Sequence, residues 1–502
     1  MESGNYFGIP PKNILAVNDK TKMIALLLIL IPLLSGLISF FIKNERDAKS
    51  WSLFASILTL VAAFAGVYNF FGVDKLSFDE SWLPALGSRF SIGLDGMGKM
   101  LCLLNAIAFP IVFASVYKNS YKKPGSFYAL MLLMQTGLMG VFLATDCLLF
   151  YFFWELALIP AYFLCSSWGG EKRIQVTFKF FIYTFTGSLL MLVGILFLYF
   201  KTPNHSFALQ AFYHIKLSTG QENFLFWLFF IAFAIKMPVF PFHTWQPDTY
   251  EQAPTAVTMI LSGVMVKMGL FGVIRWLIPM FPHAAMHYSH LIIILCIIGM
   301  LYASLIAIRQ NDLKRLIAYS SIAHIGLMCA AIFSSQQVGM QGVMIQMFNH
   351  GVNVIGLWIV ADVIETQLST RKFSELGGLA QRAPALAILL VVMALANIAL
   401  PLTNAFIGEF MMFNGLFRYN VWIAAIGGIS IILAAVYTLN MIQKVFYGNT
   451  SVVTDGAYDI TTGTKIMLTV LVIVVVVLGV YPQPMLQLTS DTVQAALIKF
   501  HP

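Results

Sequence analysis

FLFWLFFIAFAIKMPVFPFHTWQPDTYEQAPTAVTMILSGVMVKMGLFGVIRWLI, residues 224–278, contains two apolar segments that are each long enough to cross a bilayer. Lys236 and Lys267 lie near the middle of the first and second segment. A charged group at the bilayer centre costs about 2.5–3.5 kcal/mol on insertion scales, so such a lysine usually has a function. Pro238 and Pro241 follow the first lysine, and proline frees a backbone carbonyl that lipid cannot satisfy. The pattern indicates handling of ions or protons inside a membrane.

The composition agrees with a membrane protein that has little room for an extramembrane domain. The 502-residue chain is 59% hydrophobic and 10% charged, whereas about 25% of a typical soluble protein is charged. Its mean hydropathy is +0.82. The net charge of +8 does not indicate nucleic-acid binding, because the basic residues are scattered over short loops. We interpret them as determinants of membrane topology.

The sequence predicts no cofactor and no metal in this chain. The five cysteines lie in or beside apolar segments without C-x-x-C spacing, which is typical of small buried side chains. No haem-attachment motif, iron–sulfur cysteine run or nucleotide-binding glycine loop is present. His283, His287 and His290 have helical spacing, but their loop lacks a nearby cysteine or carboxylate, which disfavours a metal site. If the protein serves redox chemistry, the electrons therefore travel elsewhere.

The apolar runs predict an all-α membrane protein with about fourteen transmembrane helices. The expected helices begin near residues 23, 51, 99, 126, 147, 175, 224, 254, 289, 314, 340, 384, 420 and 465. No small-residue cleavage site follows the first run, so we expect it to be a retained helix and not a signal peptide. The longest polar connection, residues 72–99, has alternation and glycines that suit a short strand or hairpin covering one face.

Lys and Arg are distributed unequally between the two sets of loops. More of them lie on the side of KNERDAK, YKNSYKK, GGEKR, RQNDLKR and STRKFSELGGLAQR. Cytoplasmic loops carry an excess of these residues, so this side is predicted to be cytoplasmic. Both termini are then expected on the outer face.

Two groups of five spans have similar lengths, and an odd number of spans inserts the second copy upside down. The fourth helix of each group is interrupted, by IKMPVFPFHTWQ in the first and by ANIALPLTNAFIGEF, with Pro401, in the second. Matching broken helices in two inverted repeats indicate a binding or conduction site. The predicted divisions are residues 1–125 (three N-terminal helices), 126–280 and 281–450 (the two repeats, each a proton half-channel) and 451–502 (a helix and tail).

Six ionisable residues are predicted deep within the spans, and all can hold or release a proton. They are Glu155, Lys236, Lys267, His324, His350 and Glu409. Desolvation lowers the pKa of a buried lysine and a nearby carboxylate raises it again, so Glu155 could control Lys236. Histidines that titrate near neutrality make a plausible relay with water.

Structural roles are the alternatives. Glu155 and Lys236 could be a buried ion pair that fixes helix packing. Each histidine could hydrogen-bond a backbone carbonyl, and Glu409 could cap the second half-helix. Snorkelling of Lys267 is disfavoured, because it lies more than ten residues from either end of its span.

Several stretches resemble the antiporter-like subunits of respiratory complex I. They are FFWELALIPAYFL, FAIKMPVFPFHTWQPD followed by QAPTA, LSGVMVKMGLFGVIR, NDLKRLIAYSSIAHIG and FIGEF. Within that family one type carries a glutamate in a GEF context, as Gly408-Glu409-Phe410 does here, and the others carry a lysine there. The chain departs from the family pattern at Tyr250, where a second histidine is common.

The resemblance implies that Glu155, Lys236, Lys267 and Glu409 translocate protons, with His324 and His350 as the linking polar residues. It also implies a multi-pass protein of the bacterial inner (plasma) membrane, between antiporter-like chains of types L and N. NADH, FMN, iron–sulfur clusters and quinone would belong to partner subunits, including a peripheral NADH-oxidising arm. A subunit of a multisubunit sodium/proton antiporter and a membrane spacer with vestigial charges are the competing interpretations.

Overall fold

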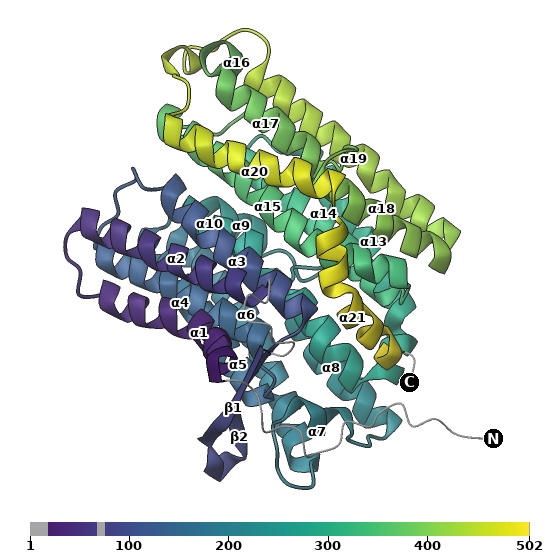
Figure 1. Ribbon diagram of the computed structural model, residues 1–502. Coiled ribbons are helices and arrows are strands. Elements are labelled where there is room, and N and C mark those ends of the chain that lie inside the picture. The colour runs from purple at the N-terminus through teal and green to yellow at the C-terminus, as the bar shows by residue number, and fades with distance from the viewer. Residues whose placement is uncertain (1–18, 68–75, 501–502) are drawn as a thin grey trace.

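The computed structural model describes residues 19–67 and 76–500 of the chain. Within these ranges the fold is helical apart from one two-stranded sheet. Long helices lie side by side in a bundle, and the sheet projects from one end of it (Figure 1). The start of the connection predicted for residues 72–99 lies outside the described residues. The all-helical class expected from the apolar runs is confirmed.

In the described part of the chain, eleven helical stretches are long and apolar enough to cross a membrane. They are α2 (Glu45–Val67), α3 (Gly96–Ser115), α4 (Pro124–Leu143), α5 (Cys147–Trp168), α6 (Arg173–Lys201), α10 to α12 (Thr255–Met280), α13 (Pro282–Arg309), α14 (Leu313–Phe333), α15 (Gln337–Leu368), α19 (Val421–Phe446) and α20 (Thr462–Val480). The other expected spans correspond to α1 (Asp19–Ser39), α8 (Thr219–Lys236) and α17 (Pro384–Asn397). Fourteen crossings therefore stay a prediction.

Two helices are followed by irregular turns. Helix α8 ends at Lys236, and the chain turns through residues 237–245 before α9 (Gln246–Gln252). The Trp245 indole donates to the carbonyl of Ile235 at 3.0 Å, which satisfies a carbonyl that the turn leaves free. Helix α17 ends at Asn397, and α18 (Asn404–Tyr419) begins after residues 398–403.

The stretch from α10 (Thr255–Ile260) through α11 (Lys267–Gly272) to α12 (Ile278–Met280) is one continuous, buried helical path. Two π-helical segments, η2 (Leu261–Met265) and η3 (Val273–Leu277), interrupt its α-helical geometry. Sequence periodicity did not predict them. Single π-turns inside α-helices are frequent at functional sites, because they shift carbonyls out of the regular hydrogen-bond ladder.

The hairpin expected between the second and third spans is present. Strands β1 (Leu76–Leu83) and β2 (Ser88–Leu94) pair antiparallel, with Leu76 opposite Leu94. Gly87, at a φ of 67°, closes the connecting turn in a left-handed conformation that glycine adopts without strain. The Thr145 amide donates to the Ser91 carbonyl at 3.0 Å and fixes the hairpin to the α4–α5 connection.

The segment expected to be a C-terminal tail is a helix. Helix α21 (Gln483–Phe500) packs against α3 and α15. A Cβ added to Gly96 at the start of α3 would lie 2.0 Å from the Leu488 carbonyl oxygen, so only glycine permits this approach. Short segments complete the described fold: η1 (Pro84–Leu86), α7 (Leu209–Tyr213), α16 (Leu379–Arg382) and η4 (Thr454–Gly456).

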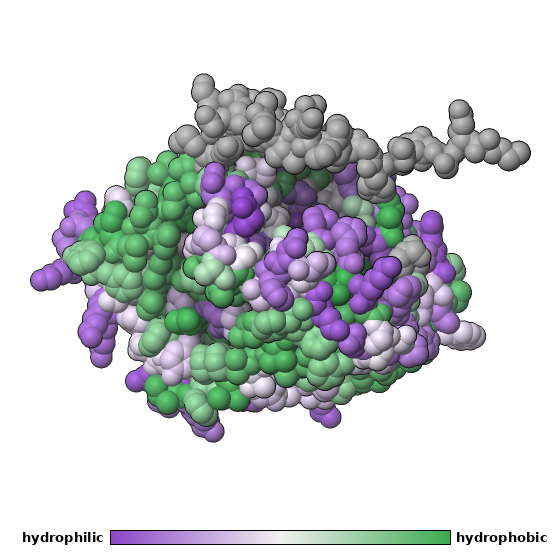
Figure 2. All heavy atoms as spheres, turned by 90° about the horizontal axis from the view of Figure 1, so that it is seen from below, coloured by the Kyte–Doolittle hydropathy of each residue, from purple (hydrophilic) through white to green (hydrophobic). Residues whose placement is uncertain are grey.

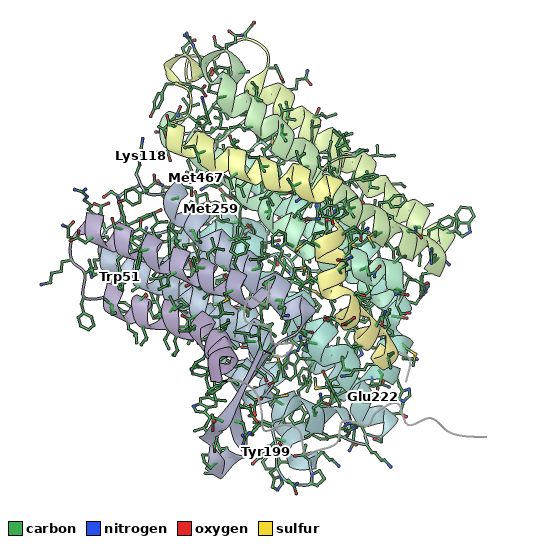
Figure 3. The ribbon with its side chains drawn as sticks, in the orientation of Figure 1. Trp51, Lys118, Tyr199, Glu222, Met259 and Met467 are labelled. Atoms are coloured by element: carbon green, nitrogen blue, oxygen red, sulfur yellow. The ribbon has the colours of Figure 1, made fainter. Side chains whose placement is uncertain are left out.

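The surface is consistent with a lipid environment on the sides of the bundle. Broad green areas of hydrophobic residues cover much of the view in Figure 2, and hydrophilic side chains gather in patches between them. Lys118 and Glu222 lie at opposite ends of the bundle (Figure 3). We call the end with Lys118 the basic face, and it includes residues 40–46, 116–123, 169–172, 310–312 and 369–378. The other end is the opposite face.

Candidate functional site

Lys236 is the last residue of α8 and lies directly at the first turn. Its side chain is buried, with 2% of its surface exposed, and its ammonium has no hydrogen-bond partner among the described residues. The ammonium lies 5.4 Å from the centre of the Trp154 ring on α5, within range of a cation–π interaction. The negative end of the α8 dipole also favours a cation at this position.

Glu155, next to Trp154 on α5, is half-buried. It forms no ion pair with Lys236 within 4.0 Å, and its buried Oε1 has no hydrogen-bond partner among the described residues. Its negative charge still attracts the Lys236 ammonium at longer range. A tight ion pair that only fixes helix packing is therefore not the arrangement found here.

Lys267 is the first residue of α11 and is fully buried. Its ammonium donates to the Ser262 carbonyl at 2.8 Å and contacts Nδ1 of His350 on α15 at 2.8 Å. The Ser262 carbonyl belongs to the π-helical segment η2. When the ammonium is charged, Nδ1 of His350 must accept from it, so this nitrogen carries no proton in that state.

The series continues from His350 to the second broken helix. The rings of His350 and His324, on α15 and α14, lie edge to face with centroids 5.5 Å apart. Nε2 of His324 is 3.8 Å from Oε1 of Glu409 on α18, and the Gln346 amide donates to the same oxygen at 3.4 Å. Lys267, His350, His324 and Glu409 thus form one buried line of titratable groups.

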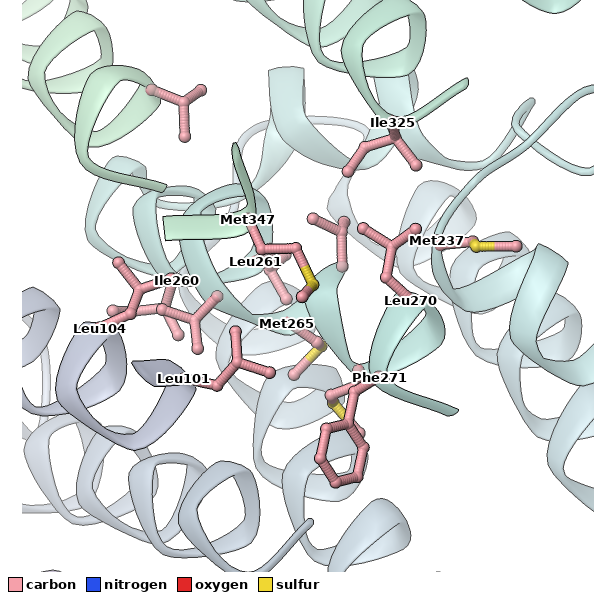
Figure 4. Close-up of a cluster of buried hydrophobic side chains, with 14 of the residues drawn as sticks. Leu101, Leu104, Met237, Ile260, Leu261, Met265, Leu270, Phe271, Ile325 and Met347 are labelled. Carbon is pink, nitrogen blue, oxygen red and sulfur yellow. The ribbon is translucent and has the colours of Figure 1, made fainter. Parts of the chain in front are cut away.

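Apolar side chains surround the centre of this line. Leu101 and Leu104 from α3, Ile325 from α14 and Met347 from α15 pack with residues of the α10–α12 path in Figure 4. All of these side chains are buried. Such packing excludes bulk solvent, so protons can move only along the polar groups and individual waters that the packing admits.

Several polar residues of the site were not predicted from the sequence. Three amide side chains of α15 serve the second break: Gln346 contacts Glu409, Asn349 donates to the Asn404 carbonyl at 2.7 Å, and Asn353 donates to the Ala396 carbonyl at 3.4 Å. Their spacing, with His350 among them, places polar groups along an otherwise apolar helix. That spacing was a signal that could have identified them.

A connected set of ion pairs on the basic face was also not predicted. Arg371 contacts Glu251, Asp312 and Glu365 at 3.1, 2.5 and 2.6 Å. Further pairs join Arg315 to Asp248 and Glu251, Lys314 to Glu365, and Lys179 to Asp248. Burial tends to lower the pKa of Arg371, but its bonds to Asp312 and Glu365 outweigh this and raise it. The network connects α9, which follows the first break, to α14 and α15.

Residues outside the line have structural contacts. Asp146 caps α5, because its carboxylate accepts from the amides of Leu148 and Leu149. Arg275 pairs with Asp95 at 2.5 Å and is only 13% exposed. His290 contacts the Tyr419 hydroxyl at 3.3 Å, and no three potential metal ligands come together among the described residues. Tyr250 is buried between Trp245 and Trp358.

Comparison with known proteins connects this geometry to a family. The family description "NADH:quinone oxidoreductase/Mrp antiporter, TM" matches residues 144–436, which include all six titratable groups. The chain belongs to this family. A relative named NADH-quinone oxidoreductase subunit M, from Rickettsia prowazekii, is 35% identical over 94% of this chain and 98% of its own length. The resemblance to subunit M, which the GEF context of Glu409 indicated, is confirmed at this level.

Solved structures share the whole architecture. A chain of respiratory complex I from Thermus thermophilus matches with a TM-score of 0.88 and 27% identity, over 96% of this chain and all of that chain. A chain of the Mrp complex from Dietzia sp. matches with a TM-score of 0.85 over 95% of this chain and 99% of that chain, but at 19% identity. The Mrp likeness shows the fold alone, so the antiporter interpretation has less support.

Proposed function

We propose that this chain is a proton-translocating membrane subunit of NADH:quinone oxidoreductase. Quinone reduction in partner subunits would drive protonation changes here and move protons from the cytoplasm to the outside. The observation that carries the proposal is the unbroken contact series Lys267–His350–His324–Glu409, which links the π-interrupted helix to the second break. The relatives named subunit M support the proposal that the chain belongs to this complex. The contact series supports the proposal that the carried ion is a proton.

The proposed relay begins with Glu155 and Lys236. Lys236 is buried without a hydrogen-bond partner among the described residues, and Glu155 is the charged group that acts on its proton. Movement of Glu155 toward Lys236 would hold the proton, and movement away would release it toward Lys267. The prolines Pro238, Pro241 and Pro401 would keep the two breaks open to protein and water.

The proposed architecture has fourteen crossings and two inverted five-helix repeats. The repeats would occupy residues 126–280 and 281–450, with 1–125 and 451–502 as flanking parts. Each turn follows the end of a helix, α8 in the first repeat and α17 in the second, which supports the correspondence. The basic face would be cytoplasmic, in the inner membrane of a bacterium.

The proposed partners are antiporter-like subunits of types L and N on either side and a peripheral arm that oxidises NADH. NADH, FMN, iron–sulfur clusters and quinone would be bound there. The chain would contribute to an oxidoreductase activity without a redox centre of its own. A sodium/proton antiporter subunit is the alternative, and a line of lysine, histidine and glutamate favours protons over sodium.

Replacement of Lys236 by alanine tests the proposal in the assembled complex. We expect NADH-driven proton pumping into inverted membrane vesicles to be lost, because the first protonatable group of the relay is gone. Lys444→Ala is the matched control, since Lys444 is an exposed residue on α19. Normal pumping by an assembled Lys236→Ala complex would exclude the relay. Pumping that stops in sodium-free medium would favour the antiporter alternative.

A further inference from the structure

A second buried polar cluster lies beside Glu409 and is not part of the relay. It consists of Tyr437 on α19, Ser320 on α14 and Asn397, the last residue of α17. Tyr437 is 1% exposed, and the other two residues are also buried. The Tyr437 hydroxyl and the Asn397 amide both contact the Ser320 hydroxyl oxygen at 3.0 Å.

Two small cavities lie on either side of the Tyr437–Ser320 hydrogen bond. The first, of about 20 Å³, is lined by His324, Glu409 and Tyr437, with Ser430 nearby. A cavity holds a water molecule when it has roughly 10–15 Å³ or more of such space and two or more polar partners. The first cavity therefore fits one water that can bridge Tyr437 and Glu409.

The second cavity, of about 10 Å³, is lined by Ser320, Asn397 and Thr438. The Thr438 hydroxyl is buried and has no hydrogen-bond partner among the described residues. A buried polar group of this kind is usually satisfied by an ordered water. The volume is at the lower limit for one water, so a small outward movement of the lining is enough to hydrate it.

The second cavity lies on the side of the cluster that faces the basic face. Its lining includes Leu316, three residues after the start of α14 at that face, and Met441, near the end of α19 at the same face. A path from Glu409 toward the basic face therefore passes the first cavity, Tyr437, Ser320 and the second cavity, in that order. Leu316 and Met441 close the second cavity toward the basic face in this conformation.

We propose that Tyr437 and Ser320 form a branch that brings protons to Glu409 from the basic face, independently of the Lys267–His350–His324 series. The inference rests on the proposed function, in which Glu409 is protonated and deprotonated during turnover. Asn397 is a positioning residue, because its amide holds the Ser320 oxygen and exchanges no proton.

The proton balance is simple. In the structure the Tyr437 hydroxyl donates to the Ser320 oxygen, so both hydroxyls first rotate until the Ser320 hydroxyl donates to the Tyr437 oxygen. A proton on a water in the second cavity then passes to the Ser320 oxygen, which releases its own proton to the Tyr437 oxygen. Tyr437 releases its hydroxyl proton to the water in the first cavity, and that water protonates the Glu409 carboxylate. Each hydroxyl gains and loses one proton, and the carboxylate becomes neutral. The transfer leaves the Tyr437 hydroxyl donating to Ser320 again, which is the arrangement in the structure.

The test uses the assembled complex in inverted membrane vesicles and removes one hydroxyl at a time. Tyr437→Phe keeps the ring packing, Ser320→Ala removes the central hydroxyl, and Ser320→Thr restores it. Tyr128→Phe is the matched control, because Tyr128 is a fully buried tyrosine on α4 without a hydrogen-bond partner among the described residues. The readouts are NADH-driven pumping rate and its ratio in H2O and D2O.

We expect Tyr437→Phe and Ser320→Ala to lower the pumping rate by about tenfold, since a positioned proton donor contributes roughly 10²-fold or more and a water can replace part of it. The solvent isotope ratio should rise in both, because proton delivery becomes rate-limiting. Ser320→Thr should recover most of the pumping rate and the isotope ratio that Ser320→Ala loses, and Tyr128→Phe should behave as the unchanged complex.

Wild-type pumping and an unchanged isotope ratio in both variants would overturn the branch. Equal impairment in Ser320→Ala and Ser320→Thr, with an unchanged isotope ratio, would show that the cluster only anchors the end of α17. If the complex with Tyr437→Phe fails to assemble, the comparison of Ser320→Ala with Ser320→Thr tests the branch by itself. Failure of the branch is distinct from failure of the proposed function, which Lys236→Ala tests in the same preparation.

Discussion

The two helix breaks hold opposite charges in different ways. Lys236 occupies the last position of α8, where the helix dipole favours a cation, and its ammonium has an aromatic ring but no hydrogen-bond partner among the described residues. Glu409 lies beyond the first turn of α18, where the dipole contributes little, and it receives Gln346 and His324 as neighbours. The charged group of the first break thus has no hydrogen-bond partner among the described residues, whereas the carboxylate of the second break has polar neighbours.

The difference suggests different tasks for the two groups. A cation without a fixed partner responds strongly to a moving carboxylate, which suits a group whose proton affinity must change. A carboxylate held by an amide and a histidine, beside a cavity with room for one water, suits a group that receives and passes protons repeatedly. Lys267 lies between them in the proposed relay, and its ammonium contacts the Ser262 carbonyl of its own helical path and His350 on α15.

The largest effect should come from the residue that joins the two regions. Lys267→Met removes the ammonium but keeps most of the side-chain volume, so pumping should fall by about 10²-fold or more. Pumping by inverted vesicles is the measurement, with Lys444→Met as the control for loss of an exposed lysine. Pumping within twofold of the unchanged complex would mean that the two breaks operate without this connection.

A smaller loss is expected when the second break loses its amide. Gln346→Leu removes the hydrogen bond to Glu409, and a bond to a charged group contributes about 1.5–3 kcal/mol. We expect roughly tenfold slower pumping at an unchanged level of assembled complex. Gln443→Leu, at an exposed position of α19, is the control. No change would show that Glu409 does not depend on its polar surroundings.

The smallest effect should come from the aromatic neighbour of the first break. Trp154→Leu removes a contact worth about 0.5–2 kcal/mol to the Lys236 ammonium, and pumping should fall about threefold. Trp422→Leu on the exposed start of α19 controls for loss of a tryptophan. An effect larger than that of Gln346→Leu would reverse the comparison, because the first break would then depend more on its partner than the second.

Much of the fold was predictable because hydrophobic length and proline position are local properties. Each expected span begins within about seven residues of the start of a helix, and the chain leaves helical geometry close to Pro238 and Pro401. Helix α21 was missed because its docking on Gly96 depends on α3, nearly four hundred residues earlier. The π-helical segments leave no sequence periodicity by which to recognise them.

The site was predictable only in its charged members. An ionisable residue inside an apolar span stands out in any sequence, which is how Lys267 and Glu409 were found. Ser262, Gln346 and Tyr437 are ordinary helix residues, and their importance comes from the neighbours that tertiary packing brings to them. The lack of a direct Glu155–Lys236 ion pair depends on how α5 and α8 pack, which a sequence does not specify.

The π-helical segment before Lys267 has a consequence for chain length. Each π-turn holds one residue more than the α-turn it replaces. The stretch from Thr255 to Met280 therefore contains more residues than a regular α-helix of the same length. Removal of one residue from η2 would return an ordinary helix and rotate everything on one side of it by about 100°. Lys267 would then leave His350 while the helix stayed intact. The direction of this lysine is thus set by a single extra residue, at a position where insertions and deletions are not neutral.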